Sequence, residues 1–313
     1  MLFLFKVFAA FSVLLIASCS TYRASKPTEA NIEVEAETIR VALVQLDADN
    51  VGNWSVIASY IRQASQNGAR IIVFPEASLF GWLNPEVFYD PQPIPNAATT
   101  MLAAYAETYN MAIVFGMAEQ GPAAPGNDPS VHQAYDSAVL ISASGDLLIN
   151  SRKYQVLKNA FNPADCPDGL KNPTNGGCSY YQSPVSKIPV IDTMLGRTAV
   201  LVCADAYTWD TAALDHVKAL GVETIFVVWG VAGPTTQSCG TDGFNATAYA
   251  ADAARYTGAT VIGANAVGPR PYGRFLPSVY CGYSGIVTGN GVTLGSVGLV
   301  AGASYFDVPR VKE

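Results

Sequence analysis

The sequence predicts an α/β fold with mixed sheets in one domain. Short apolar segments that read as buried strands alternate with segments of helical spacing. Two pairs of neighbouring strand-like segments are joined by tight-turn residues, which predicts hairpins. The chain has 313 residues, of which 50% are hydrophobic and 14% charged, so a large core can be buried. No repeat or second linker interrupts 38–313, and we expect one domain over this range.

The predicted elements begin at Ile39. The first helix carries Trp54, Ile57 and Ile61 on one face, and Gly68 closes it. Pro75 ends the second strand. The predicted strands span 39–46, 71–74, 111–117, 198–202, 223–229 and 260–264. The predicted helices span 53–67, 96–109, 210–220 and 244–256. The predicted hairpins pair 137–142 with 146–151, turning at 144–146, and 283–288 with 292–297, turning at 290–291.

The N-terminal segment has the pattern of an export signal. Lys6 precedes an apolar stretch from Val7 to Ala17, which is too short to span a bilayer comfortably. The residues Ile16-Ala17-Ser18-Cys19 resemble the lipobox of bacterial lipoproteins, which implies cleavage before Cys19 and acylation of that residue. The alternative is an ordinary cleaved signal peptide. We therefore expect a signal peptide over 1–18 and a polar tether over 19–37.

Several properties exclude classes of function. The net charge is −7 and no basic run is present, which argues against nucleic acid as a partner. The two histidines, His132 and His216, lie far apart in unrelated contexts. This argues against a multi-histidine metal site and leaves few candidates for a Ser-His-Asp triad. We expect no metal.

Three residues follow predicted strands and carry reactive groups. Cys203 directly follows the strand 198–202, a position where α/β proteins usually place their chemistry. The alternative is a structural role, which is more common for a lone cysteine. Glu76 follows the strand 71–74, and burial there would make it a better base at neutral pH. Lys153 follows a hairpin and could bind a developing oxyanion. The alternatives are a solvated glutamate and a surface lysine.

Taken in the order Glu76, Lys153, Cys203, these residues resemble the catalytic triad of the carbon-nitrogen hydrolase (nitrilase) superfamily. Five motifs carry the resemblance. They are Phe74-Pro75-Glu76, Arg152-Lys153 with Leu157, Gly196 through Cys203-Ala204-Asp205, Ala264 through Gly268, and Gly282 through Val287. The resemblance implies an αββα sandwich of two mixed sheets flanked by helices.

Within the superfamily the chain is most similar to the vanin (pantetheinase) and biotinidase branch. The stretch Phe74 through Trp82 and the loop Lys153-Tyr154, Phe161, Asp165-Cys166-Pro167 carry this likeness. It implies cleavage of pantetheine-like or biotinyl amides. Two features depart from the family pattern: Ala253 through Thr257 replaces the usual Arg-Ala-x-Glu-Asn, and Ala204 stands where an aromatic residue is common.

The second glutamate that the family often carries after its lysine is missing, because no glutamate lies between Glu119 and Glu223. Asp165 is the candidate substitute, and the alternative is that the role is absent. In the implied mechanism, Glu76 takes the thiol proton, Cys203 attacks an amide or nitrile carbon, and Glu76 later activates the water that hydrolyses the thioester.

Lys153 and the backbone N–H of Ala204 would stabilise the oxyanion, and no cofactor is needed. Lys153 should also lower the thiol pKa of Cys203. Trp82 and Trp229 are candidates for the walls of the substrate pocket, although buried aromatic residues are more often plain core. Asp165 is a third candidate pocket residue.

Four cysteines remain once Cys19 is assigned to lipid and Cys203 to catalysis, and they permit three connectivities. Paired cysteines persist in the oxidising compartment of an exported protein. We favour the pair Cys166–Cys178, which would close a Gly/Asn/Pro-rich loop, together with Cys239–Cys281. The alternative is that some remain free thiols.

The sequence thus predicts a small-molecule amide hydrolase, held on a membrane by its lipid anchor. Ser20 after Cys19, with no aspartate there, favours the outer membrane, and a homo-oligomer is expected from the superfamily. An N-acyltransferase of the same superfamily and a non-catalytic binding lipoprotein are the alternatives. The retention of Glu76, Lys153 and Cys203 together argues against the second.

Overall fold

The computed structural model describes residues 38–125 and 130–310. The predicted signal peptide, the tether and the lipidation site Cys19 lie outside the described residues, so they stay predictions. Within the described ranges, no helix combines the length and the apolar character that crossing a bilayer demands.

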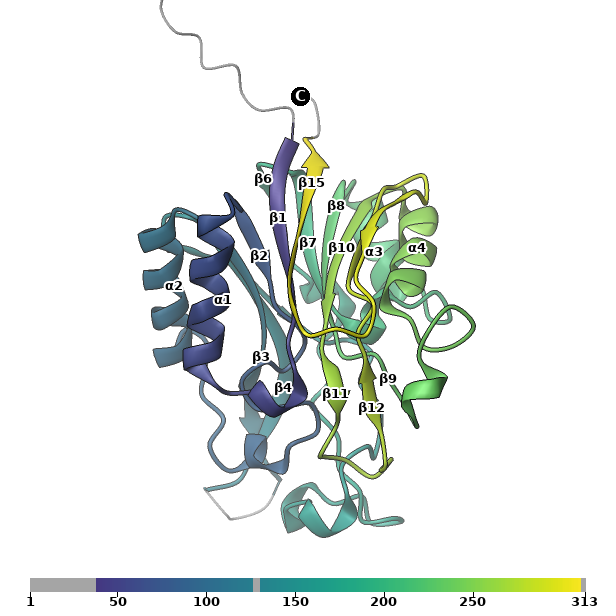
Figure 1. Ribbon diagram of the computed structural model, residues 1–313. Coiled ribbons are helices and arrows are strands. Elements are labelled where there is room, and N and C mark those ends of the chain that lie inside the picture. The colour runs from purple at the N-terminus through teal and green to yellow at the C-terminus, as the bar shows by residue number, and fades with distance from the viewer. Residues whose placement is uncertain (1–37, 126–129, 311–313) are drawn as a thin grey trace, which may run out of the picture. The chain divides into compact units, whose positions relative to one another are not determined.

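Two six-stranded mixed sheets face each other (Figure 1). The first has the order β15-β1-β2-β3-β4-β5, in which β1, β2 and β3 run parallel and the outer neighbours antiparallel. Its strands are β1 Thr38–Gln45, β2 Ile71–Val73, β3 Ala112–Ala123, β4 His132–Ile141, β5 Leu147–Arg152 and β15 Gly302–Pro309.

The second sheet has the order β14-β13-β10-β8-β7-β6, with β10, β8 and β7 parallel in its centre. Its strands are β6 Val190–Thr193, β7 Gly196–Val202, β8 Thr224–Trp229, β10 Thr260–Asn265, β13 Gly285–Val287 and β14 Thr293–Ser296. A small antiparallel sheet joins β9 Ala232–Gly233, β11 Val267–Pro269 and β12 Val279–Cys281.

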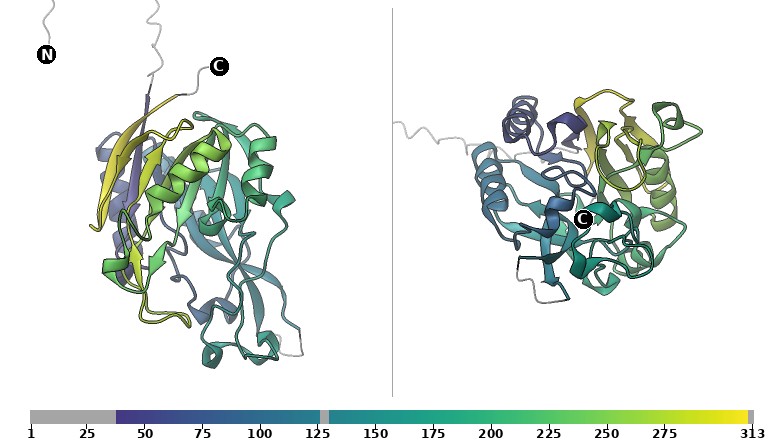
Figure 2. Two further views of the ribbon diagram at one scale, coloured as in Figure 1. Left: turned by 90° about the vertical axis from the view of Figure 1, so that its right-hand side faces the viewer. Right: turned by 90° about the horizontal axis from the view of Figure 1, so that it is seen from below.

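Helices cover the outer face of each large sheet (Figures 1 and 2). The first sheet carries α1 Trp54–Gln66 and α2 Ala97–Tyr109, and the second carries α3 Ala212–Ala219 and α4 Ala246–Thr257. Three apolar layers result: one under each helix pair, and one between the sheets that includes Val73, Val202 and Val228. This arrangement confirms the predicted αββα sandwich.

Local capping explains where the helices begin and end. The Asn53 side chain accepts a hydrogen bond from the Val56 N–H at the start of α1. At the start of α2, Asn96 and Thr99 cap each other reciprocally. Gly258, with φ of +82°, ends α4 in the left-handed region that glycine adopts without strain.

The structure adds strands that the sequence patterns did not predict. β6 and β15 are half-exposed, and the hydrophobic runs that reveal buried strands are weak there. β15 nevertheless pairs with β1 over its whole length, from Thr38 opposite Pro309 to Gln45 opposite Gly302. β4 begins at His132, five residues before its predicted start at 137, which brings Asp136 into the strand.

Candidate active site

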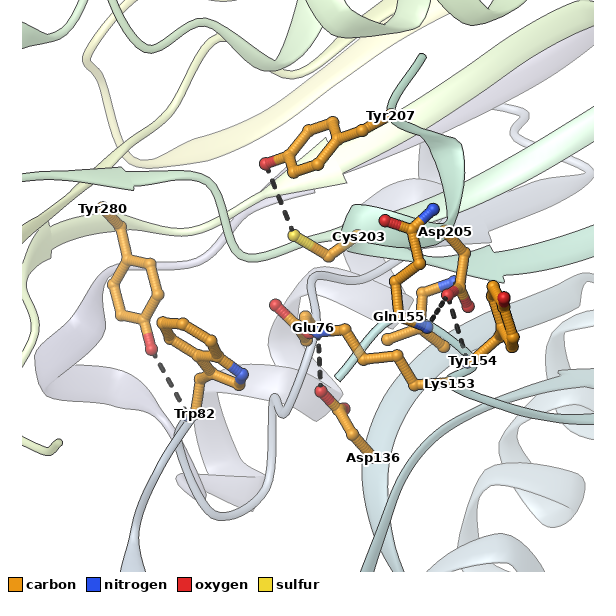
Figure 3. Close-up of polar contacts among 11 residues, drawn as sticks. Glu76, Trp82, Asp136, Lys153, Tyr154, Gln155, Cys203, Asp205, Tyr207 and Tyr280 are labelled. Atoms are coloured by element: carbon orange, nitrogen blue, oxygen red, sulfur yellow. Dashed lines mark hydrogen bonds and ion pairs between the residues drawn. The ribbon is translucent and has the colours of Figure 1, made fainter. Parts of the chain in front are cut away.

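Glu76, Lys153 and Cys203 come from three loops that directly follow strands β2, β5 and β7. All three are buried, with 4%, 3% and 6% of their surfaces exposed. The ammonium of Lys153 donates to Oε1 of Glu76. Figure 3 shows Cys203 beside this pair. The structure therefore brings together the three residues that the sequence singled out.

Lys153 is held by a second carboxylate, Asp136 of β4. Its Nζ lies 3.0 Å from Asp136 Oδ2, and its backbone N–H donates to the Asp136 carbonyl oxygen at 2.8 Å. A lysine ammonium has three hydrogens. Glu76 and Asp136 take two of them, which leaves one for a substrate oxygen.

The pKa values of this cluster reflect its burial and its charges. Burial raises the pKa of Glu76 well above its usual value, and the negative charge of Asp136 raises it further, against the opposing effect of Lys153. Burial by itself would lower the pKa of Lys153, but the attraction of Asp136 and Glu76 outweighs it and the pKa is raised. Lys153 is thus a permanent cation at neutral pH, next to a carboxylate that binds protons readily.

Cys203 directly follows β7 and is the first residue of the short 3-10 helix Cys203–Ala206. Its φ is +45°. Such a conformation is strained for a residue with a side chain and persists only where the surroundings enforce it. Ala204 follows it, and the first N–H groups of such a helix have no partner within the helix. The oxyanion role of Ala204 stays a prediction.

The thiol pKa differs from the expectation. Burial and the charge of Glu76 raise the pKa of Cys203 to about 12, although Lys153 and a hydrogen bond from the Gly230 backbone act to lower it. The predicted lowering by Lys153 is therefore present but outweighed. Cys203 rests as a thiol, and a base must remove its proton during the reaction.

Asp205 connects the lysine loop to the cysteine turn. Its Oδ1 accepts hydrogen bonds from the backbone N–H groups of Tyr154 at 3.0 Å and Gln155 at 2.7 Å, and its Oδ2 from that of Val202 at 3.4 Å. The carboxylate is fully buried. Asp205 thus fixes the chain after Lys153 relative to the chain around Cys203.

Gly230, directly after β8, lies between the base and the nucleophile. A Cβ atom at this position would overlap Oε2 of Glu76. The backbone of Gly230 also acts to lower the pKa of the Cys203 thiol. The Glu76 N–H donates to the Trp229 carbonyl oxygen at 3.2 Å, which ties the loops of the two sheets together.

Trp82 lies at the site as predicted. Its half-buried ring has its centroid 5.5 Å from Lys153 Nζ and 5.0 Å from the guanidinium carbon of Arg270. Its backbone N–H donates to the hydroxyl of Tyr280 at 3.3 Å. Figure 3 shows Trp82 and Tyr280 together on one side of Glu76.

Two predicted pocket residues have other positions. Trp229 is fully buried, and its ring stacks on Tyr207 at 5.8 Å, so it supports the site from within the core and does not form a pocket wall. Asp165 is exposed in the 3-10 helix Pro163–Asp165. The second carboxylate on Lys153 is Asp136, which precedes the lysine in the chain. The substitution of the missing glutamate by Asp165 stays a prediction.

Sequence reasoning missed Asp136, Tyr207 and Gly230. The available signal for Asp136 was a carboxylate at the edge of an apolar strand, which is costly to bury unless it is paired. Tyr207, whose hydroxyl lies 3.8 Å from the Cys203 sulfur, is one of several aromatic residues in its neighbourhood and carries no distinguishing pattern.

Both predicted disulfides are present. Cys166 is bonded to Cys178, and Cys239 to Cys281. Of the cysteines in the described ranges, Cys203 is the free one. The chain thus keeps a single reduced thiol there, at the residue predicted to be the nucleophile.

Comparison with known proteins agrees with this geometry. The model of the family described as carbon-nitrogen hydrolase matches residues 40–311. The arylacetonitrilases of Fusarium vanettenii and Macrophomina phaseolina are each 29% identical to the chain, over 130 and 133 residues. These alignments cover 37% and 38% of this chain, and only 36% of the length of each relative.

Solved structures show the same fold. A mutant of the amidase from Nesterenkonia sp. AN1, with the result of Michael addition of acrylamide at its active site cysteine, has a TM-score of 0.65 and 22% identity. The match covers 87% of this chain and 93% of that chain. A second mutant of this amidase, described as from the nitrilase superfamily, has the same TM-score and identity over 88% and 93%. Because the family model spans almost all of the described residues, the chain belongs to the carbon-nitrogen hydrolase family.

Proposed function

We propose that the protein hydrolyses a non-peptide carbon-nitrogen bond of a small amide through a thioester on Cys203. The observation that carries this proposal is the buried Glu76–Lys153 ion pair beside the one free cysteine of the described chain. The attraction within a buried ion pair is largely offset by the cost of desolvating its two charges, so such a pair adds little to stability. Its placement beside a nucleophile therefore points to a catalytic role.

In the proposed reaction, Glu76 accepts the thiol proton as the sulfur of Cys203 bonds to the amide carbon. The oxyanion that develops receives the third hydrogen of Lys153 and the N–H of Ala204. Glu76 then gives its proton to the departing amine, and the acyl group remains on sulfur. Water, deprotonated by Glu76, attacks the thioester and releases the acid and the thiol.

Small linear amides are the proposed substrates, and pantetheine-like or biotinyl amides are the specific candidates, on the motif likeness of Phe74 through Trp82 and of the Lys153 loop. Nitrile hydrolysis is the second candidate, because two relatives are described as arylacetonitrilases. The same thiol would add to the nitrile carbon, and two waters would then release ammonia and the acid.

The cellular setting is also a proposal. The lipobox-like residues Ile16 through Cys19 favour a lipid-anchored protein on the outer membrane, with its substrate outside the cytoplasm. Growth with a labelled fatty acid tests this. Label should enter the wild-type protein and be absent from Cys19→Ser, and label in both would contradict acylation at this residue.

A hydrolysis screen tests the reaction. Pantetheine, biotin amides, aliphatic amides and nitriles are offered to the wild type and to Cys203→Ser, with amine or ammonia release as the readout. We expect release by the wild type from at least one class and a loss of about a thousandfold or more in the variant. Comparable release by a folded Cys203→Ser would refute the thioester mechanism.

A further inference from the structure

The Cys203 sulfur has a neighbour that the proposed mechanism leaves unused. The hydroxyl of Tyr207 lies 3.8 Å from Sγ, within the range of hydrogen bonds to sulfur. Figure 3 shows this hydroxyl directed at the sulfur, with Glu76 and Lys153 on the other side of Cys203. The sulfur thus lies between its base and a phenolic O–H.

Aromatic neighbours from three elements hold the Tyr207 ring in place. It stacks on the buried Trp229 of β8 at 5.8 Å, meets Tyr249 of α4 edge-on at 4.6 Å, and contacts Trp209 of its own loop at 4.1 Å. The backbone N–H of Tyr207 donates to the Ala204 carbonyl oxygen at 3.0 Å. Both the backbone and the ring are therefore fixed, so the hydroxyl position is determined by packing.

A hydrogen-bond donor at this position would help to form the Cys203 thiolate. The thiol is buried beside the negative Glu76, and both effects disfavour the thiolate. The main charged or polar groups that act on the sulfur are Glu76, Lys153, the Gly230 backbone and Tyr207, and Tyr249 also interacts electrostatically with Cys203. Lys153 donates two of its hydrogens to carboxylates, and the negative charges of these carboxylates oppose its effect on the sulfur. A neutral O–H that donates to the developing thiolate stabilises it without competing for the proton on Glu76.

We propose that Tyr207 is a catalytic residue whose hydroxyl donates a hydrogen bond to the Cys203 thiolate as Glu76 takes the thiol proton. The inference rests on the proposed function of Cys203 as nucleophile. The proton passes from sulfur to Glu76, the Tyr207 O–H keeps its own proton throughout, and the hydrogen bond weakens once the sulfur forms its bond to carbon. Tyr207 thus lowers the barrier of the acylation step.

Alkylation by iodoacetamide tests this directly, because it measures the sulfur alone and needs no amide substrate. In Tyr207→Phe the ring stack is kept and the donor is removed. A hydrogen bond to a charged group is commonly worth about a tenfold change or more. We expect the second-order rate of Cys203 alkylation at constant pH, and kcat/KM for the best amide, each to fall by about tenfold, with the melting temperature unchanged.

Tyr249→Phe is the matched control, because Tyr249 belongs to the same ring cluster and meets Tyr207 through its ring. It should leave both rates within about twofold of wild type. Equal alkylation of Tyr207→Phe and wild type would overturn the inference about Tyr207. That result would leave the proposed function standing, since the function depends on the separate loss of activity in Cys203→Ser.

Discussion

Glu76 and Asp136 share a single ammonium, and both carboxylates are buried with it. Each also has one buried oxygen without a hydrogen-bond partner among the described residues, Oε2 of Glu76 and Oδ1 of Asp136. The free oxygen of Glu76 is the one that lies next to Gly230 and is suited to accept the thiol proton.

The first prediction concerns Asp136→Asn. Asp136 raises the pKa of Glu76, second in effect only to burial, so loss of its charge lowers that pKa. Glu76 must be deprotonated to act as the base, and activity falls as pH drops through its pKa. The acid limb of the kcat/KM profile should therefore move to lower pH.

A pH-rate profile of amide hydrolysis measures this shift. Asp192→Asn is the control, because that carboxylate is exposed and only loosely paired with Arg197 at 3.8 Å. Its profile should match the wild type. An acid limb of Asp136→Asn that stays in place, or that moves to higher pH, would contradict the electrostatic role of Asp136.

Lys153→Met gives the second prediction. Removal of the ammonium leaves two carboxylates buried without a counter-charge, and broken buried pairs of this kind cost about 3–5 kcal/mol of unfolding free energy. Activity should disappear as well. Urea unfolding measures the stability loss. Lys171→Met is the control, because its pair with Asp168 is exposed to solvent and should contribute little to stability. Equal stability of the two variants would argue against the buried cluster.

At the level of elements, the loop after β8 is shaped around the site. Gly230 is the residue whose missing side chain allows the Glu76 carboxylate to approach the sulfur. The third prediction is that Gly230→Ala displaces that carboxylate and lowers kcat by about a hundredfold, since displacements near 1 Å have such effects. Gly298→Ala is the control, because a Cβ there meets nothing. Steady-state kinetics that show full activity in Gly230→Ala would contradict this packing.

Elements differ in how well the sequence predicts them. The central strands β1, β2, β7, β8 and β10 are buried on both faces, and their continuous apolar runs are easy to recognise. β15 is half-exposed and owes its conformation to pairing with β1, a contact more than 250 residues away. No local pattern encodes a partner at such a distance, so this strand was missed.

The three central residues of the candidate site could be predicted from local sequence, whereas the residues around them could not. Glu76, Lys153 and Cys203 each end a recognisable segment, and their motifs resemble those of a known family. Asp136 and Tyr207 act through proximity that only tertiary packing creates. The sign of the thiol pKa shift also required the structure, because it depends on how completely Cys203 is buried.

At the scale of the whole molecule, the site is assembled across the two sheets. Glu76 and Lys153 follow strands of the first sheet, and Cys203 follows a strand of the second. The apolar layer between the sheets, which includes Phe226 and Ile262, sets their separation. Correct placement of the thiol relative to its base therefore depends on that layer.

The fourth prediction tests this dependence. Phe226→Ala should remove about 3–5 kcal/mol of unfolding free energy, because Phe226 is fully buried between the sheets. Activity and the native tryptophan fluorescence should be lost at the same urea concentration in wild type, and together at a lower one in the variant. Activity that persists after the fluorescence change would show that the site does not need both sheets.

The burial of Cys203 also matters for the two disulfides of the folded chain. Thiol-disulfide exchange and peroxide both consume the thiolate, and a thiol with a pKa of about 12 offers almost none of it at neutral pH. Once folded, the protein can meet oxidants without scrambling its crosslinks through this sulfur or losing it to overoxidation. The same environment that obliges the reaction to recruit a base therefore acts as a chemical safeguard between turnovers.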